Sequence, residues 1–121
     1  MAAPIVLVVE DDPATQQIVV RWLEEEGYQV LTAAPEAVLP LARSAHPAVL
    51  LLDYLLPGMT GAALSRCLRA DPATAAIPII ATSGLPGAAR EAGMLADAWL
   101  AKPFDADALC MAVAQRLARS G

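Results

Sequence analysis

Short apolar runs alternate along the chain with longer segments in which apolar positions recur at helical spacing. The runs are about five residues long, the usual length of a strand, and the central ones are apolar enough to be covered on both faces. The predicted strands are residues 5–9, 28–32, 49–53, 77–81 and 97–101. The segments between them predict helices over residues 13–26, 35–44, 60–70 and 88–95, followed by a last helix that Asp105 caps.

This alternation predicts an α/β fold with a parallel sheet, because each helix carries the chain back to the sheet in a right-handed crossover. Residues 28–32 form the most polar of the predicted strands and are therefore placed at an edge. The expected architecture is a doubly wound, five-stranded parallel sheet in the order 2-1-3-4-5, flavodoxin-like, with helices on both faces. Ligands of such sheets bind at the carboxyl ends of the strands.

Two local features refine the helices. Pro40 lies inside residues 35–44, where proline removes a backbone donor and clashes with the preceding turn, so we expect a short helix that begins late or bends there. The inner stripe of the helix over residues 60–70 is predicted to be Ala63, Leu64, Cys67 and Leu68. Cys67 and Cys110 have no CxxC partner, and both are expected to be reduced core thiols.

Composition limits the classes of function. A chain of 121 residues has the usual size of one domain, so residues 1–121 are expected to form a single domain without an effector domain. The net charge of −5 argues against a nucleic-acid surface. No apolar run approaches the roughly 18 residues of a membrane span, and the first residues lack the basic region of a signal peptide. We therefore expect a cytoplasmic protein with neither a membrane nor a nucleic acid as its partner.

Reactive side chains stand at the ends of four predicted strands. Glu10 and Asp11 follow the first strand, Asp53 ends the third, Ser83 follows the fourth and Lys102 follows the fifth. The predicted strand order brings these ends together, and two carboxylates about 4 Å apart repel by about 4 kcal/mol at an effective dielectric constant of 20. Mg²⁺, a hard cation that takes oxygen ligands, would relieve this repulsion.

The same groups suit phosphoryl transfer. Asp53 is the carboxylate left to act as a nucleophile, Ser83 offers a hydroxyl to a phosphoryl oxygen, and Lys102 supplies a positive charge for a phosphate or carboxylate oxygen. The simpler interpretation is that Asp53 only caps the turn that follows it. Asp12 is predicted to cap the helix that begins at Pro13.

Four motifs carry a resemblance to a known family. Residues 8–13, 52–61, 77–84 and 100–104 resemble, in order and spacing, the receiver domain of two-component response regulators of the single-domain, chemotaxis-regulator-like kind. The resemblance covers essentially the whole chain. It implies that Asp53 accepts a phosphoryl group from a histidine kinase or a phosphotransfer protein. The chain would then not be an enzyme but a phosphoacceptor that assists its own phosphorylation and its slow dephosphorylation.

The resemblance also implies a metal site. Glu10 and Asp11 match an acidic pair in which Asp11 would bind Mg²⁺ directly beside Asp53. The main-chain carbonyl of Leu55 would be a third ligand.

Further roles follow from the same resemblance. Ser83 stands five residues after Pro78, as the family's hydroxyl does, so Thr82 would point to the opposite face. Lys102 matches the family's lysine and is followed by Pro103, a proline that a cis bond usually precedes. Trp99 falls where the family places a switch aromatic; the alternative is that it only packs between the fifth strand and the fourth helix.

The chain departs from the family pattern in two places. The segment between Ser83 and Lys102 is shorter than usual, so the helix over residues 88–95 is expected to be stunted, which would change the family's output face. Leu55 and Leu85 occupy positions that often tune hydrolysis in this family. Both are apolar and cannot orient a water molecule, which predicts slow self-dephosphorylation.

The expected function is a phosphorylation switch of a two-component system or phosphorelay that changes affinity for an unknown downstream protein. A receiver excised from a hybrid sensor kinase or multidomain regulator is an alternative, as is a scaffold that acts without phosphorylation. A phosphatase with an aspartyl nucleophile would want an Asp at the position of Leu55 as general acid. A flavodoxin-like cofactor binder would need a hydroxyl- and Gly-rich loop where the acidic residues 10–12 stand.

Overall fold

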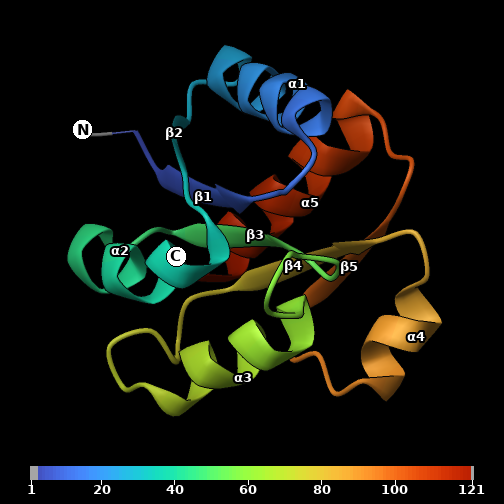
Figure 1. The fold of residues 1–121 in the computed structure, drawn as a ribbon. Coiled ribbons are helices and arrows are strands. Elements are labelled where there is room, and N and C mark those ends of the chain that lie inside the picture. The colour runs from blue at the N-terminus through green and yellow to red at the C-terminus, as the bar shows by residue number, and fades with distance from the viewer. Residues whose placement is uncertain (1–2, 121) are drawn as a thin grey trace.

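A computed structural model describes residues 3–120 of the chain. Five strands alternate with helices from one end to the other (Figure 1). The strands are β1 (Ile5–Val9), β2 (Gln29–Thr32), β3 (Val49–Asp53), β4 (Ile79–Ser83) and β5 (Ala98–Ala101). The helices are α1 (Pro13–Glu25), the 3₁₀ turn η1 (Pro35–Ala37), α2 (Val38–Ala45), α3 (Gly61–Ala70), α4 (Pro86–Glu91) and α5 (Ala106–Ser120).

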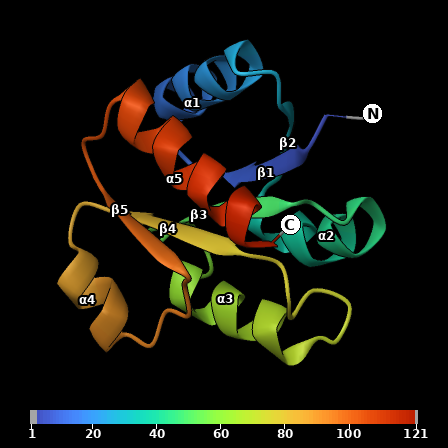
Figure 2. The same cartoon turned by 180° about the vertical axis from the view of Figure 1, so that it is seen from behind.

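The strands form one parallel sheet in the order β2-β1-β3-β4-β5, which confirms the predicted fold class. Helices α1 and α5 cover one face of the sheet, and α2, α3 and α4 cover the other (Figures 1 and 2). Each face has its own apolar core: Leu51 and Ile80 belong to the α1–α5 side, and Leu52 and Ala81 to the other. Side chains in β3 and β4 therefore alternate between two buried layers.

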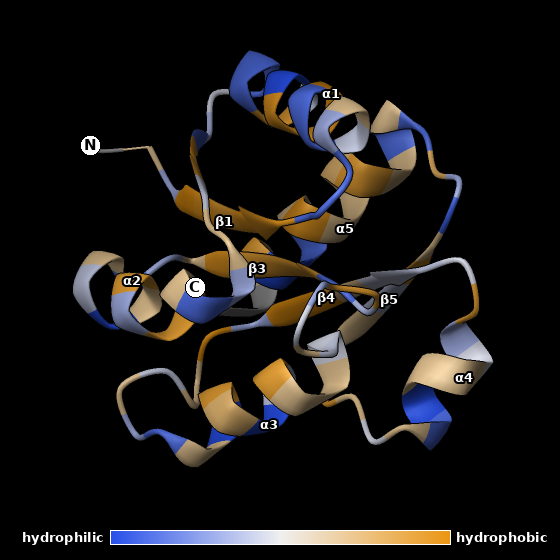
Figure 3. Cartoon of the chain, in the orientation of Figure 1, coloured by the Kyte–Doolittle hydropathy of each residue, from blue (hydrophilic) through white to orange (hydrophobic). Residues whose placement is uncertain are grey.

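Burial follows the strand order. Every residue of β3 and β4 is buried, whereas the two edge strands, β2 and β5, have no buried residue. Figure 3 shows the same contrast, with apolar residues concentrated in β1 and β3. The prediction that residues 28–32 form an edge strand is confirmed. Polar side chains at the tips of the central strands are consequently held in surroundings that contain little water.

Pro40 has the effect that the sequence predicted. The chain first makes the turn η1, and α2 begins only at Val38, so Pro40 lies in the first turn of the helix. Backbone N–H groups in the first turn have no partner within the helix, so proline costs little there.

The inner face of α3 differs from the prediction. Leu64 and Leu68 are buried as expected, but Cys67 is exposed and Ser65 is fully buried in its place. The Ser65 hydroxyl donates to the Ala62 carbonyl at 2.7 Å and accepts from the Leu95 N–H at 2.9 Å, so burial leaves it paired. The prediction of two core thiols is therefore wrong for Cys67.

The second cysteine is also not a core residue. Cys110 is only partly buried in α5, where the buried residues are Leu109 and Val113. Both cysteines are free thiols, as predicted.

Helix α4 is short, as the shortened segment predicts, although it begins earlier than expected. It has six residues and ends before Gly93, whose φ of 84° is a conformation that favours glycine. Arg66 of α3 donates to the Ala92 carbonyl at 2.9 Å and to the Gly93 carbonyl at 3.2 Å. A side chain of α3 thus satisfies the carbonyls at the end of α4.

The turn between β3 and α3 depends on a glycine. The N–H of Gly61 donates to the Tyr54 carbonyl at 2.7 Å, and Thr60 caps α3 by accepting from the Ala63 N–H at 3.1 Å. A Cβ added to Gly61 would lie 2.2 Å from the Asp53 carbonyl oxygen and 2.8 Å from the Tyr54 Cα. These are backbone atoms, so they cannot move aside without displacing the end of β3.

We predict that Gly61→Ala destabilises the fold by about 2 kcal/mol or more, because the added methyl group forces the backbone at Asp53 to shift. Denaturant unfolding measures this loss. Gly87→Ala is the matched control: a Cβ there meets nothing within 4 Å, so its effect should be small. Equal stability of the two variants would contradict the close approach at Gly61.

Candidate phosphoacceptor site

Three strand ends bring charged side chains together at the carboxyl edge of the sheet. Asp53 is the last residue of β3, Glu10 follows β1 and Lys102 follows β5. The Lys102 Nζ lies 2.7 Å from Glu10 Oε1 and 3.1 Å from Asp53 Oδ2. We call these three residues the ion triad. Its members were predicted from the sequence to converge, and the geometry confirms that they do.

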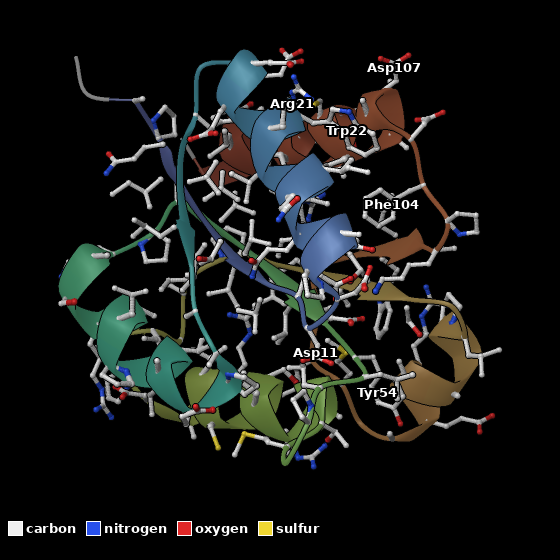
Figure 4. The ribbon with its side chains drawn as sticks, turned by 45° about the horizontal axis from the view of Figure 1, so that its top comes forward. Asp11, Arg21, Trp22, Tyr54, Phe104 and Asp107 are labelled. Atoms are coloured by element: carbon white, nitrogen blue, oxygen red, sulfur yellow. The ribbon has the colours of Figure 1, made fainter. Side chains whose placement is uncertain are left out.

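The β5–α5 loop brings Lys102 to this position. Its backbone N–H donates to the Ser83 carbonyl at 2.9 Å, which extends the pairing of β4 and β5 by one step. The following Lys102–Pro103 peptide bond is cis, as the resemblance implied. Phe104 then packs into the core on the α1–α5 side, beside Trp22 (Figure 4). The lysine side chain points toward the ends of β1 and β3, where Glu10 and Asp53 lie.

The ion triad perturbs the titration of Glu10 and Lys102. Burial raises the pKa of Glu10 to about 7, the nearby Asp53 carboxylate adds to this rise, and Lys102 opposes it. Partial burial disfavours the charge on Lys102, but its hydrogen bonds and attraction to the two carboxylates outweigh this and raise its pKa. One ammonium thus faces two carboxylates in a site with little water.

Asp11 does not join the ion triad. Asp11 is exposed, and its backbone N–H donates to Glu10 Oε2 at 3.1 Å. In Figure 4 Asp11 lies at the same end of the sheet as Tyr54, the residue after Asp53. Glu10 and Asp11 also line a cleft of about 370 Å³ with Gln16, Leu56 and Pro57.

Among residues 3–120, no group of three or more His, Cys, Asp or Glu side chains is arranged to hold a metal ion. The structure therefore brings together two of the predicted metal ligands, Glu10 and Asp53, around Lys102, while Asp11 borders the adjoining cleft. Carboxylate oxygens beside this cleft are suited in their chemistry to a hard cation such as Mg²⁺. The oxygen donors of Glu10, Asp11 and Asp53 are thus of the kind that Mg²⁺ binds, and their role as its ligands stays a prediction.

Asp12 has the role of a helix cap. Its Oδ2 accepts from the Thr15 backbone N–H at 3.0 Å and from the Thr15 hydroxyl at 2.6 Å. These hydrogen bonds hold the pKa of Asp12 below its usual value. The N-cap prediction is confirmed.

Two neighbouring hydroxyls at the end of β4 have different surroundings. Ser83 is buried, and its hydroxyl accepts from the Leu85 N–H at 2.9 Å. Thr82 points to the opposite face, as predicted, but this is the face that Asp53 shares: the two residues are paired in register, and the Thr82 Oγ1 lies 3.4 Å from Asp53 Oδ1. This contact was not predicted from the sequence. It follows from side-chain alternation once the register that pairs Asp53 with Thr82 is known.

The predicted switch aromatic lies next to α4. Trp99 is partly buried in β5, and the Arg90 guanidinium lies 4.7 Å from the centre of its ring. Register pairs Trp99 with Ala81, which places both on the same face of the sheet as Ser83. The switch role of Trp99 stays a prediction.

The rim of the site is apolar. The side chains of Leu55 and Leu85, in the loops after β3 and β4, are each 70 % exposed. Neither carries a polar group that could direct water toward Asp53.

These observations define a class of protein: a doubly wound α/β domain that holds a carboxylate pair and a lysine at the carboxyl edge of its sheet. The chain belongs to the response regulator receiver domain family, whose sequence model matches residues 6–114.

Curated relatives support this assignment. The chain is 36% identical over 119 residues to the response regulator PleD of Caulobacter vibrioides, covering 94% of this chain and 26% of PleD. It is 31% identical to the DNA-binding response regulator MtrA of Mycolicibacterium smegmatis, covering 95% of this chain and 51% of MtrA. The chain thus spans from about a quarter to about half of these relatives.

Solved structures agree in fold over nearly the whole chain. The receiver domain of the sensor histidine kinase PA1611 from Pseudomonas aeruginosa, with a magnesium ion coordinated in its active site cleft, is 28% identical with a TM-score of 0.89, covering 97% of this chain and 99% of that one. The chemotaxis response regulator CheY4 of Vibrio cholerae is 27% identical with a TM-score of 0.83, covering 95% and 99%. No helix within residues 3–120 is long and apolar enough to cross a membrane.

The raised pKa of Glu10 predicts a pH dependence for the metal-free protein. Between pH 4.5 and about 7 the folded state holds a proton on Glu10 that the unfolded state has lost, so raising the pH destabilises the fold. Glutamine has no proton to lose. As the pH rises through this window, the free energy of unfolding of Glu10→Gln should therefore increase by roughly 1–3 kcal/mol relative to that of the wild type. Denaturant unfolding in EDTA at several pH values measures the difference, and a difference independent of pH would contradict it.

Proposed function

We propose that the chain is a phosphorylation switch in which Asp53 accepts a phosphoryl group from a phosphohistidine of a histidine kinase or phosphotransfer protein. The observation that supports this most directly is the ion triad, with Lys102 Nζ 3.1 Å from Asp53 Oδ2 at the carboxyl edge of the sheet. An ionised carboxylate needs no base, so Asp53 attacks directly. The new bond joins a carboxylate oxygen to phosphorus, and the bond that breaks joins phosphorus to the imidazole nitrogen.

The other groups at the site would offset the negative charge that is brought together in this step. Glu10, Asp11, Asp53 and the main-chain carbonyl of Leu55 are the proposed ligands of Mg²⁺. The ion would neutralise negative charge on the transferring group. Lys102 supplies positive charge from the opposite side and, after transfer, exchanges its contact with Asp53 for one with a phosphoryl oxygen.

The phosphoryl group adds about −1.5 to −2 charges at the sheet edge, which gives the switch its driving force. Ser83 would donate its hydroxyl to a phosphoryl oxygen and give up the contact that now holds the loop, the hydrogen bond from the Leu85 N–H. Trp99 lies on the same face and would repack in response. The output is a change in affinity for a downstream protein.

The setting of this switch is also proposed. Two free thiols, one of them exposed, suit the reducing cytoplasm. A stand-alone regulator and a domain of a hybrid kinase or multidomain regulator both fit, since PleD and MtrA are longer than the matching region and PA1611 is a sensor kinase. MtrA is a DNA-binding regulator, so the expectation of no nucleic-acid partner concerns this chain alone. The ion triad argues against the alternative that the chain is a scaffold that acts without phosphorylation.

We predict that incubation with acetyl phosphate and Mg²⁺ adds one phosphoryl group, visible by mass spectrometry, and that Asp53→Asn abolishes it. Asp12→Asn is the matched control, because asparagine caps a helix about as well as aspartate and Asp12 serves only as a cap. A phosphorylated Asp53→Asn protein, or an inert wild type, would refute the proposal and favour the scaffold.

We further predict a long-lived phosphorylated form. Leu55 and Leu85 cannot direct water, so loss of the phosphoryl group in Mg²⁺ should take minutes or longer. Leu55→Asn adds an amide that can orient water and should accelerate the loss several-fold. Leu95→Asn changes an exposed leucine in the α4–β5 loop and should leave the rate unchanged. Loss of the group from the wild type within seconds would count against the role of the apolar rim.

A further inference from the structure

The end of β3 is held by Thr82 through two contacts. The Thr82 carbonyl accepts from the Tyr54 N–H at 3.0 Å, and the Thr82 hydroxyl donates to Asp53 Oδ1 at 3.4 Å. The register of β3 and β4 pairs Asp53 with Thr82, so both side chains leave the sheet on the same face. Thr82 thus binds the backbone just after the phosphoacceptor and the carboxylate itself.

We infer that Thr82 is a positioning residue, whose hydroxyl fixes the orientation of the Asp53 carboxylate for phosphoryl transfer. This role rests on the proposed function of Asp53. Lys102 contacts Oδ2, and Thr82 contacts Oδ1. With one partner on each oxygen, the plane of the carboxylate is defined before any phosphodonor arrives, and less of the barrier is spent on orienting it.

Burial explains why the hydroxyl stays with Asp53. Thr82 is only 3 % exposed and Asp53 only 6 %, so neither polar group has ready access to water. A buried hydroxyl without a hydrogen bond is costly, and Asp53 Oδ1 is the acceptor the structure offers it. Thr82 shares its face of the sheet with the apolar Leu51 and Ile80, which offer no alternative.

The length of the contact sets the size of the effect. At 3.4 Å the bond is longer than the usual 2.5–3.0 Å of an O–H···O bond, so it is weak. Removing it should slow phosphorylation without abolishing it. Ser83 cannot substitute, because its side chain leaves the sheet on the face opposite to that of Asp53.

Thr82→Val tests the inference, since valine keeps the shape and strand preference of threonine and deletes only the hydroxyl. The initial rate of phosphorylation is measured against acetyl phosphate concentration at fixed Mg²⁺. We expect the maximal rate to fall about two- to fivefold with the half-saturating concentration unchanged. Thr82→Ser, which keeps the hydroxyl, should restore the rate.

Thr74→Val is the matched control. Thr74 is another buried threonine, whose hydroxyl donates to the Leu68 carbonyl at 2.7 Å, and it lies in the α3–β4 loop. This variant should lower Tm and leave the phosphorylation rate unchanged. If Thr82→Val does not fold, Thr82→Ala compared with Thr82→Ser replaces it.

A second readout does not depend on phosphorylation. The carboxyl ¹³C resonance of Asp53 in the metal-free protein should shift in Thr82→Val and stay in place in Thr82→Ser and Thr74→Val. An unmoved resonance overturns the inference, and so does a moved resonance with an unchanged rate. If the wild type accepts no phosphoryl group, the proposed function fails by itself, and a moved resonance would still establish the contact.

Discussion

The ammonium of Lys102 between two buried carboxylates is the interaction on which this site depends. It joins the ends of β1, β3 and β5, with β4 lying between the last two in the sheet. Without the positive charge, Glu10 and Asp53 would repel each other in a region of low dielectric constant. One cation for two carboxylates still leaves an excess of negative charge, and the pKa of Glu10 is raised mainly by burial and further by the neighbouring Asp53 carboxylate. This excess of negative charge is the physical basis for proposing that the site binds a second cation, Mg²⁺.

The sheet supplies the rigidity that such an arrangement requires. β3 and β4 are buried along their whole length, so Asp53 is carried by a strand that cannot shift without disturbing two cores. The loops that follow these strands are polar or exposed, and Leu55 and Leu85 lie in them. Asp53, the proposed phosphoacceptor, is thus fixed by the sheet, while the rim residues Leu55 and Leu85 lie in exposed loops outside the two cores.

Most of the fold and the ion triad could be predicted from the sequence, because apolar runs identify central strands and strand order brings their ends together. Three features could not. Hydrophobicity predicts that Cys67 is buried and Ser65 exposed, but the reverse is found. Ser65 can be buried because its hydroxyl is hydrogen-bonded to the backbone of Ala62 and Leu95. The contact of Thr82 with Asp53 depends on the exact register of β3 and β4, which periodicity alone does not give. Asp11, which is exposed in the bend after β1, stays outside the ion triad.

The short α4 is held to the rest of the domain by two arginine side chains. Arg66 binds the carbonyls at its end, and Arg90 within it stacks on Trp99 of β5. A cation over an aromatic ring contributes about 0.5–1 kcal/mol at an exposed site, so the contact of Arg90 with Trp99 is weak. Movement of Trp99 toward Ser83 must therefore break the contact with Arg90 or carry α4 along. If phosphorylation of Asp53 moved Trp99, as proposed above, the change would reach the surface through α4, a helix of only six residues.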